Sequence, residues 1–252
     1  MKSMIVLGIV SFFIMGASIA YAAPTGRPPA LETRAAGRQD ATMSRLKTRA
    51  DNEITRRVNA LTKLMSRISE MKRLTSDQKT GLTSQAQAEI TSLNTLKAKI
   101  DADTDIATLR TDVQSITKSY RIYALYIPKM YIIMHADRLL GLVDDMTVLQ
   151  AKLQVRIDAL KAEGKDTSQM QAFISNMTTK LADAKTKAQS AIDMVMPLTP
   201  EGFPGNKATL VSARTLLQTV RKDLADAHKA AQQIRQNAKI TPVGPTPTPA
   251  TP

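Results

Sequence analysis

Three aspartates at alternate positions have the spacing that comes closest to a metal site. Asp101, Asp103 and Asp105 are spaced like the opening of a calcium-binding loop, whose side-chain oxygens converge on one cation. The sixth position of such a loop needs glycine for its sharp turn, and here it is Ile106. Carboxylates in front of a helix can instead accept hydrogen bonds from its free backbone amides. The pattern leaves metal binding and helix capping open, and it favours capping.

A cluster of tyrosines between Tyr120 and Tyr131 is the second set of residues that could carry a function. Tyr120 and Tyr123 continue the apolar stripe of a helix, so we expect them to pack in the core. Off that stripe lies a candidate amphipathic patch for a glycan, a peptide or a lipid headgroup, made of Tyr126, Lys129, Tyr131 and Arg138. The alternative is that the tyrosines fill a corner where two helices meet around Pro128. Since proline lacks a backbone donor, we expect a kink or break of the helix at Pro128.

No combination of residues typical of catalysis appears in the chain. It has no cysteine and two histidines, and His135 falls at a helix seam position that favours a structural role. A serine-histidine-aspartate order with an elbow glycine pattern, a glycine loop for phosphates and an HExxH helix are all absent. We therefore expect no enzyme activity and no cofactor.

The charge is strongly basic and unevenly distributed. The formal net charge is +13, and residues 27–73 hold 12 Lys and Arg against 5 Asp and Glu. The candidate basic face there consists of Arg45, Arg49, Arg56, Arg57, Lys63 and Arg67. Such a face suits an anionic envelope polymer, a membrane surface or a partner protein, or it serves only solubility. The lack of interleaved aromatic residues argues against specific nucleic-acid binding.

Apolar residues return three and four apart from Ile54 to Ala238, which is the spacing of packed helices. We predict an all-α fold, an elongated antiparallel helical bundle or coiled coil of about six helices after a signal peptide. The first helix is expected from Asp40 to Leu74, and Ser76 is expected to cap the second. The fifth and sixth predicted helices both have large apolar residues early and alanines late. Antiparallel pairing places the large residues of each helix opposite the alanines of the other, which predicts an antiparallel coiled coil of the last three helices.

The N-terminal sequence is typical of a secretory signal. Lys2 precedes an apolar run that ends in small residues, and cleavage is expected after Ala22. The predicted organisation is a signal peptide over 1–22, a flexible leader over 23–39, three helices over 40–127, a three-helix coiled coil over 128–239 and a Thr/Pro-rich tail over 240–252. We expect a secreted or extracytoplasmic protein, anchored in the membrane at its N-terminus if the signal is not cleaved.

Two stretches carry resemblances to known proteins. Residues 74–78, Leu-Thr-Ser-Asp-Gln, resemble the LTxxQ motif of Spy and CpxP periplasmic chaperones, which implies a small exported helical protein. A broader similarity from Leu61 to Arg138, with Leu-Lys-Ala-Lys-Ile-Asp-Ala-Asp-Thr-Asp at 96–105 and Ser-Tyr-Arg-Ile-Tyr-Ala-Leu-Tyr-Ile-Pro at 119–128, resembles uncharacterised exported helical proteins of ultra-small candidate-phylum bacteria. That likeness implies a location outside the cytoplasm and assigns no role to a residue.

Together these features predict an exported, non-enzymatic helical protein that binds or scaffolds at the cell envelope. The alternative is an extracytoplasmic chaperone-like or membrane-active protein that uses the region from Tyr120 to Met134. The oligomeric state and the ligand stay open at this point.

Overall fold

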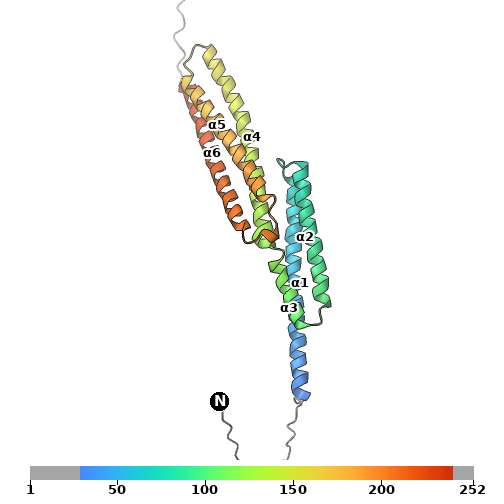
Figure 1. Ribbon diagram of the computed structural model, residues 1–252. Helices are drawn as coiled ribbons and strands as arrows, with labels where there is room; N and C mark the ends of the chain where they lie inside the picture. The colour runs from blue at the N-terminus through green and yellow to red at the C-terminus, as the bar shows by residue number, and fades with distance from the viewer. Residues whose placement is uncertain (1–28, 241–252) are drawn as a thin grey trace, which may run out of the picture. The chain divides into compact units, whose positions relative to one another are not determined.

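The computed structural model describes residues 29–240, and their regular structure is helical, with no strand (Figure 1). The α-helices are α1 Pro29–Glu70, α2 Ser76–Ala102, α3 Ile106–Lys118, α4 Ile127–Ala162, α5 Ser168–Val195 and α6 Asn206–Ile240. A π-helix, η1 (Ile122–Tyr126), directly precedes α4, and a 3₁₀ turn, η2 (Pro200–Gly202), precedes α6. The predicted all-α class is confirmed.

The described residues begin inside the segment that was expected to be a leader. Helix α1 starts at Pro29, so the prediction of a flexible segment is wrong for residues 29–39. Proline is well suited to a first helical turn, where its missing amide has no partner to lose. The expected signal peptide at 1–22, the rest of the leader and all of the tail predicted at 240–252 except Ile240, which ends α6, lie outside the described residues. None of the described helices is both long and apolar enough to cross a membrane.

The described residues divide into two units, with the boundary after Thr42. The first is described only as the start of α1, where the Thr42 hydroxyl donates to the carbonyl of Arg38 at 2.7 Å. Everything below concerns the second unit.

Helices α1, α2 and α3 share one apolar core. The buried residues of α2 are the ones its periodicity predicts, namely Leu82, Ala86, Ile90, Leu93, Leu96 and Ile100. Five of them pack with Ile54 and Leu61 of α1 and with Leu109 and Ile116 of α3. The sixth, Leu82, packs in the core that contains the buried residues of α4, α5 and α6. The cap of α2 is Thr75 and not Ser76, because Thr75 accepts from the amide of Gln78, whose side chain in turn accepts from the amide of Thr75. This reciprocal capping box stops α1 and α2 from merging into one helix.

The connection between α3 and α4 differs most from the prediction. The chain breaks at Arg121, which has a φ of 47°, and continues as η1, whereas the expected break was at Pro128. The Arg121 guanidinium lies over the ring of Phe203 at 4.5 Å from its centre, a cation–π contact that helps hold this left-handed residue in place. Because α4 is already under way at Pro128, the proline falls in its first turn, where its missing amide is tolerated.

Helices α4, α5 and α6 lie side by side (Figure 1) and share a second core. The stripe predicted for α5 is buried throughout, from Met170 to Val195. At the end of α4, Gly164 has a φ of 75°, and the amide of Lys165 donates to the carbonyl of Leu160 at 3.1 Å. These are the features of a Schellman motif, so the predicted glycine cap is confirmed. One expected core residue of α4, Leu142, is 46% exposed.

Charged side chains fix two contacts in this unit. Asp223 of α6 is 3% exposed and pairs with Lys180 at 3.1 Å and Lys187 at 2.6 Å, both from α5. Arg73, between α1 and α2, contacts two aspartates of α4. Its backbone amide donates to Asp137 at 2.7 Å, and the Nε of its side chain pairs with Asp144 at 2.5 Å. The first set aligns α5 with α6, and the second attaches the α1–α2 turn to α4.

Candidate functional site

The three aspartates considered as metal ligands lie at helix ends, where one caps a helix and another pairs with a lysine. Asp105 is the N-cap of α3 and accepts from the amide of Thr108 at 2.7 Å, a bond that lowers the pKa of its carboxyl. Asp103 follows the C-terminal end of α2, and Asp101 pairs with Lys97 at 3.1 Å. Within the described residues, no group of three or more His, Cys, Asp or Glu side chains could hold a metal ion. The structure therefore supports the capping interpretation of Asp105.

The candidate patch around the tyrosines does not form as one surface. The extra residue in the π-turn rotates the chain, so Tyr126 points inward with 7% exposure, while Tyr123, expected in the core, is 48% exposed. Tyr126 donates to Glu89 at 3.2 Å, and burial raises the pKa values of both groups. Lys129 is 0% exposed. Of the four predicted residues, only Tyr131 and Arg138 lie on the surface.

Lys129 is a buried cation at the start of α4. Its Nζ donates to Gln85 Oε1 of α2 at 3.0 Å and to the carbonyls of Met196 and Leu198 at 2.5 and 3.2 Å. Burial lowers the pKa of Lys129 to about 8. This side chain thus ties α2, α4 and the connection after α5 together, and it offers nothing to an external ligand.

The basic face of α1 is present with one exception. Five of its six predicted cations are exposed, namely Arg45, Arg49, Arg56, Lys63 and Arg67. Arg57 is 5% exposed, pairs with Glu53 at 2.5 Å and lies over the ring of Tyr123 at 5.0 Å from its centre. It is therefore a structural residue, since a guanidinium with these contacts is not available to a partner.

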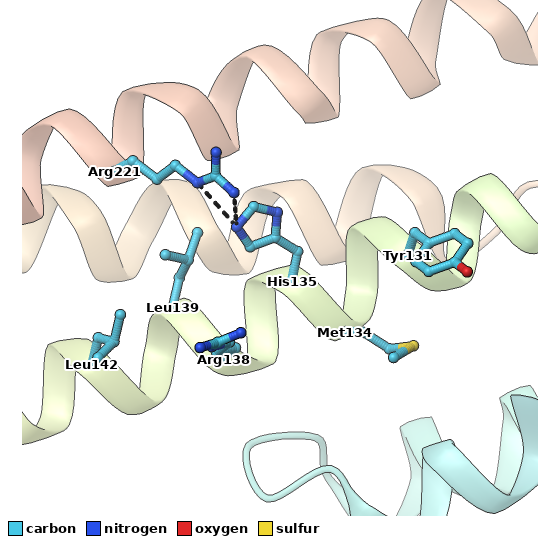
Figure 2. Close-up of a pocket in the computed structure, with 7 residues that line it drawn as sticks. All are labelled: Tyr131, Met134, His135, Arg138, Leu139, Leu142 and Arg221. Carbon is cyan, nitrogen blue, oxygen red and sulfur yellow. Dashed lines mark hydrogen bonds between the residues drawn. The ribbon is translucent and has the colours of Figure 1, made fainter.

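A groove between α4 and α6 brings surface residues of different chemistry together. It consists of two adjoining hollows of about 680 and 280 Å³ that share Tyr131, His135 and Arg221, and we call it the α4/α6 groove. The remaining lining residues are Ile132, Met134, Arg138, Leu139, Leu142, Arg214, Leu217 and Gln218. Figure 2 shows the larger hollow, with Tyr131, Met134, Arg138 and Leu142 spaced along α4 and Arg221 reaching over from α6.

His135 and Arg221 form the contact at the centre of the groove. The Nε of Arg221 donates to His135 Nε2 at 3.1 Å, and its second nitrogen lies 2.8 Å from the same atom (Figure 2). Since a guanidinium can only donate, Nε2 must be an acceptor and the ring proton is on Nδ1. Burial first, and then the charges of Arg221 and Arg138, lower the pKa of His135. His135 is therefore neutral at ordinary pH and orients Arg221.

The groove combines positive charge with apolar surface. Arg138, Arg214 and Arg221 line it, and the described residues of its two hollows include no carboxylate. Tyr131 in this groove is 57% exposed, and the lining also includes the buried apolar residues Leu139 and Leu217. Guanidinium groups without acidic neighbours are suited to carboxylate, phosphate or sulfate oxygens, and an exposed tyrosine ring can pack against a sugar or an apolar group.

Tyr131 and Arg138 were predicted from the sequence as candidate binding residues, whereas His135 was expected to be structural and Arg214 and Arg221 were missed. These two arginines are seven residues apart on α6, just as Tyr131 and Arg138 are on α4. A spacing of seven places both members of a pair on the same helix face, and this signal could have marked them. The pairing of the two faces required the relative register of α4 and α6.

Comparison with known proteins adds no family to this description. No family model matches the chain, and no curated protein or solved structure matches it either.

Proposed function

We propose that the chain is an exported binding protein without enzyme activity, and that it holds an anionic polymer of the cell envelope in the α4/α6 groove. The observation that carries the proposal is that Arg138, Arg214 and Arg221, from two helices, line one groove that has no carboxylate among its described lining residues. Export is supported by the signal-like residues 1–22 of the sequence.

The geometry of the groove favours an extended ligand over a single small anion. Arg214 and Arg221 are seven residues apart, which corresponds to about 10 Å along a helix, and Arg138 of α4 lines the hollow that contains Arg221. A polymer with repeated anionic groups can engage these cations at the same time, and the exposed ring of Tyr131 offers a surface for the units between them. The net charge of +13 adds long-range attraction for such a ligand.

The alternative function, a chaperone or membrane-active role for the region from Tyr120 to Met134, has less support. Ile122, Leu125, Tyr126 and Lys129 within it are all buried. Exposing them to a lipid or a client would require the helices around them to separate, with loss of the contacts of Lys129.

The test is to measure binding of the purified chain to polyanions that differ in their charged group. Calorimetry would compare polyphosphate, polyglutamate and dextran sulfate with neutral dextran. We expect binding to the charged polymers and a loss of about a hundredfold or more in affinity for the double variant Arg138→Gln and Arg221→Gln, because each of the two lost charge-assisted hydrogen bonds is worth about 1.5 to 3 kcal/mol.

A matched control separates the groove from net charge. Arg156 and Arg235 are exposed on the same two helices and do not line the groove. The variant Arg156→Gln and Arg235→Gln removes the same charge, so it should retain most of the affinity. An equal loss in both double variants, or no binding to any polyanion, would contradict the proposal.

A further inference from the structure

His135 faces cations from two helices and has no acidic neighbour among the described residues of the groove. Around its ring are Tyr131 and Arg138 of its own helix and Arg214 and Arg221 of α6. Asp137, two residues further along α4, accepts from the backbone amides of Lys72 and Arg73 in the α1–α2 turn. Nothing in the lining of the groove would therefore compensate a positive charge on the imidazole.

The neutral imidazole holds Arg221 by a lone pair that protonation would remove. Both donors of Arg221 that reach His135 end on the same atom, Nε2, at 3.1 and 2.8 Å. When Nε2 takes up a proton it becomes a donor, and two cations then face each other at hydrogen-bond distance. The contact must break, which releases the N–H groups of Arg221 and adds a second donor with positive charge to the groove.

We propose that His135 is the positioning residue for Arg221 and makes the α4/α6 groove a pH-dependent anion site, whose affinity rises when the imidazole takes up a proton. This inference rests on the proposed function and specifies how the same groove is regulated. The preferred ligand class is a polymer with sulfate, phosphate or carboxylate groups, because an anion placed among His135, Arg138 and Arg221 supplies the negative charge that the groove lacks.

Linkage gives the sign and size of the effect. A bound anion stabilises the imidazolium, so it raises the pKa of His135, and the same coupling raises the affinity for the anion as the pH falls. If binding raises that pKa by one unit, the affinity increases about tenfold between the neutral and the protonated state.

The experiment uses dextran sulfate, whose sulfate ester groups each keep one negative charge between pH 5.5 and 7.5. The first measurement follows the imidazole signals of the wild-type chain by NMR during a pH titration. The chain has two histidines, His135 and His228, so His228→Gln assigns both signals. We expect dextran sulfate to raise the pKa of His135 by about one unit and to leave His228 unchanged.

The second measurement is the affinity for dextran sulfate at pH 7.5 and 5.5. It should increase several-fold, towards the tenfold limit set by a one-unit shift, in the wild type and in His228→Gln on acidification. His135→Gln keeps an oxygen acceptor for Arg221 and cannot titrate, so it should match the wild type at pH 7.5 and lose the pH response. His135→Ala cannot titrate either, so it should lose the pH response in the same way.

The results separate this inference from the proposed function. Binding that depends on Arg138 and Arg221 but has the same affinity at both pH values, with no change in the pKa of His135, overturns the switch and leaves the binding function intact. Retention of the pH response in His135→Gln overturns it too. Absence of binding at both pH values overturns both.

Discussion

The buried amine of Lys129 makes a quantitative prediction about stability and pH. The side chain is 0% exposed, and its pKa is lowered from 10.5 to about 8. The unfolded chain therefore binds more protons than the native chain between about pH 8 and 10.5. Stability must rise with pH in this window, because protonated Lys129 is penalised only in the folded state.

The magnitude follows from the two pKa values of Lys129, 10.5 and about 8. Relative to an amine with an unshifted pKa, the lowered pKa of Lys129 costs about 3 kcal/mol of stability at pH 7, and at pH 9.5 this cost falls to about 1.4 kcal/mol. In Lys129→Met this dependence is absent, while the carbonyls of Met196 and Leu198 lose their donor at every pH. The free energy of unfolding of the wild type should thus gain about 2 kcal/mol relative to Lys129→Met between pH 7 and 9.5.

Urea unfolding followed by circular dichroism at both pH values measures this difference. Other titrating groups are common to the two chains and cancel. Lys185 is exposed on α5, so Lys185→Met is the matched control and should run parallel to the wild type. If the curves for Lys129→Met and the wild type also stay parallel within about 0.5 kcal/mol, the idea that Lys129 is charged and buried at neutral pH is refuted.

Three further predictions concern a buried ion-pair cluster and two helix caps. Asp223→Asn should lower the free energy of unfolding by about 3 kcal/mol in urea, because it leaves two lysines around a buried site without their charge partner. Burial raises the pKa of Asp223, but the hydrogen bonds from the two lysines outweigh it and the pKa is lowered. The contribution of Asp223 to the free energy of unfolding should therefore persist at neutral pH and disappear on acidification through that lowered pKa. An acid titration of both chains measures this. Thr75→Ala should cost about 1 kcal/mol in thermal unfolding through loss of the cap of α2, and Thr75→Ser should restore most of it. Gly164→Ala should cost about 1 kcal/mol in the same assay, because the φ of 75° is unfavourable for alanine even though its side chain would meet no neighbour.

Helix positions and their buried faces were predictable because they depend on local periodicity. The faces of α2 and α5 were identified correctly since each is a single uninterrupted helix. The prediction failed around Arg121, where a left-handed residue is followed by a π-turn. Neither has a clear sequence signal, and the extra residue exchanges the environments of Tyr123 and Tyr126.

Only the α4 side of the groove could be predicted, because the α6 side depends on contacts between distant parts of the chain. Tyr131, Arg138 and His135 belong to one helix, and their spacing could be read from it. Arg221 lies 86 residues from its partner His135, so their contact depends on how α4 and α6 align. Lys129 was assigned to a surface patch because lysine is usually exposed, and only the tertiary structure provides its three buried acceptors.

The π-turn at Ile122–Tyr126 makes the chain sensitive to length at this point. A π-turn accommodates one residue more than an α-turn, so deletion of Ala124 would allow continuous α-helix here. Every side chain from Leu125 onward would then be rotated by about 100° relative to α3. Such a deletion would carry Lys129 away from its carbonyl partners, so single-residue loss here should be tolerated far less than in the loop around Lys165. The π-turn thus sets the rotation of α4 about its axis at the point where the last three helices are joined to the first three.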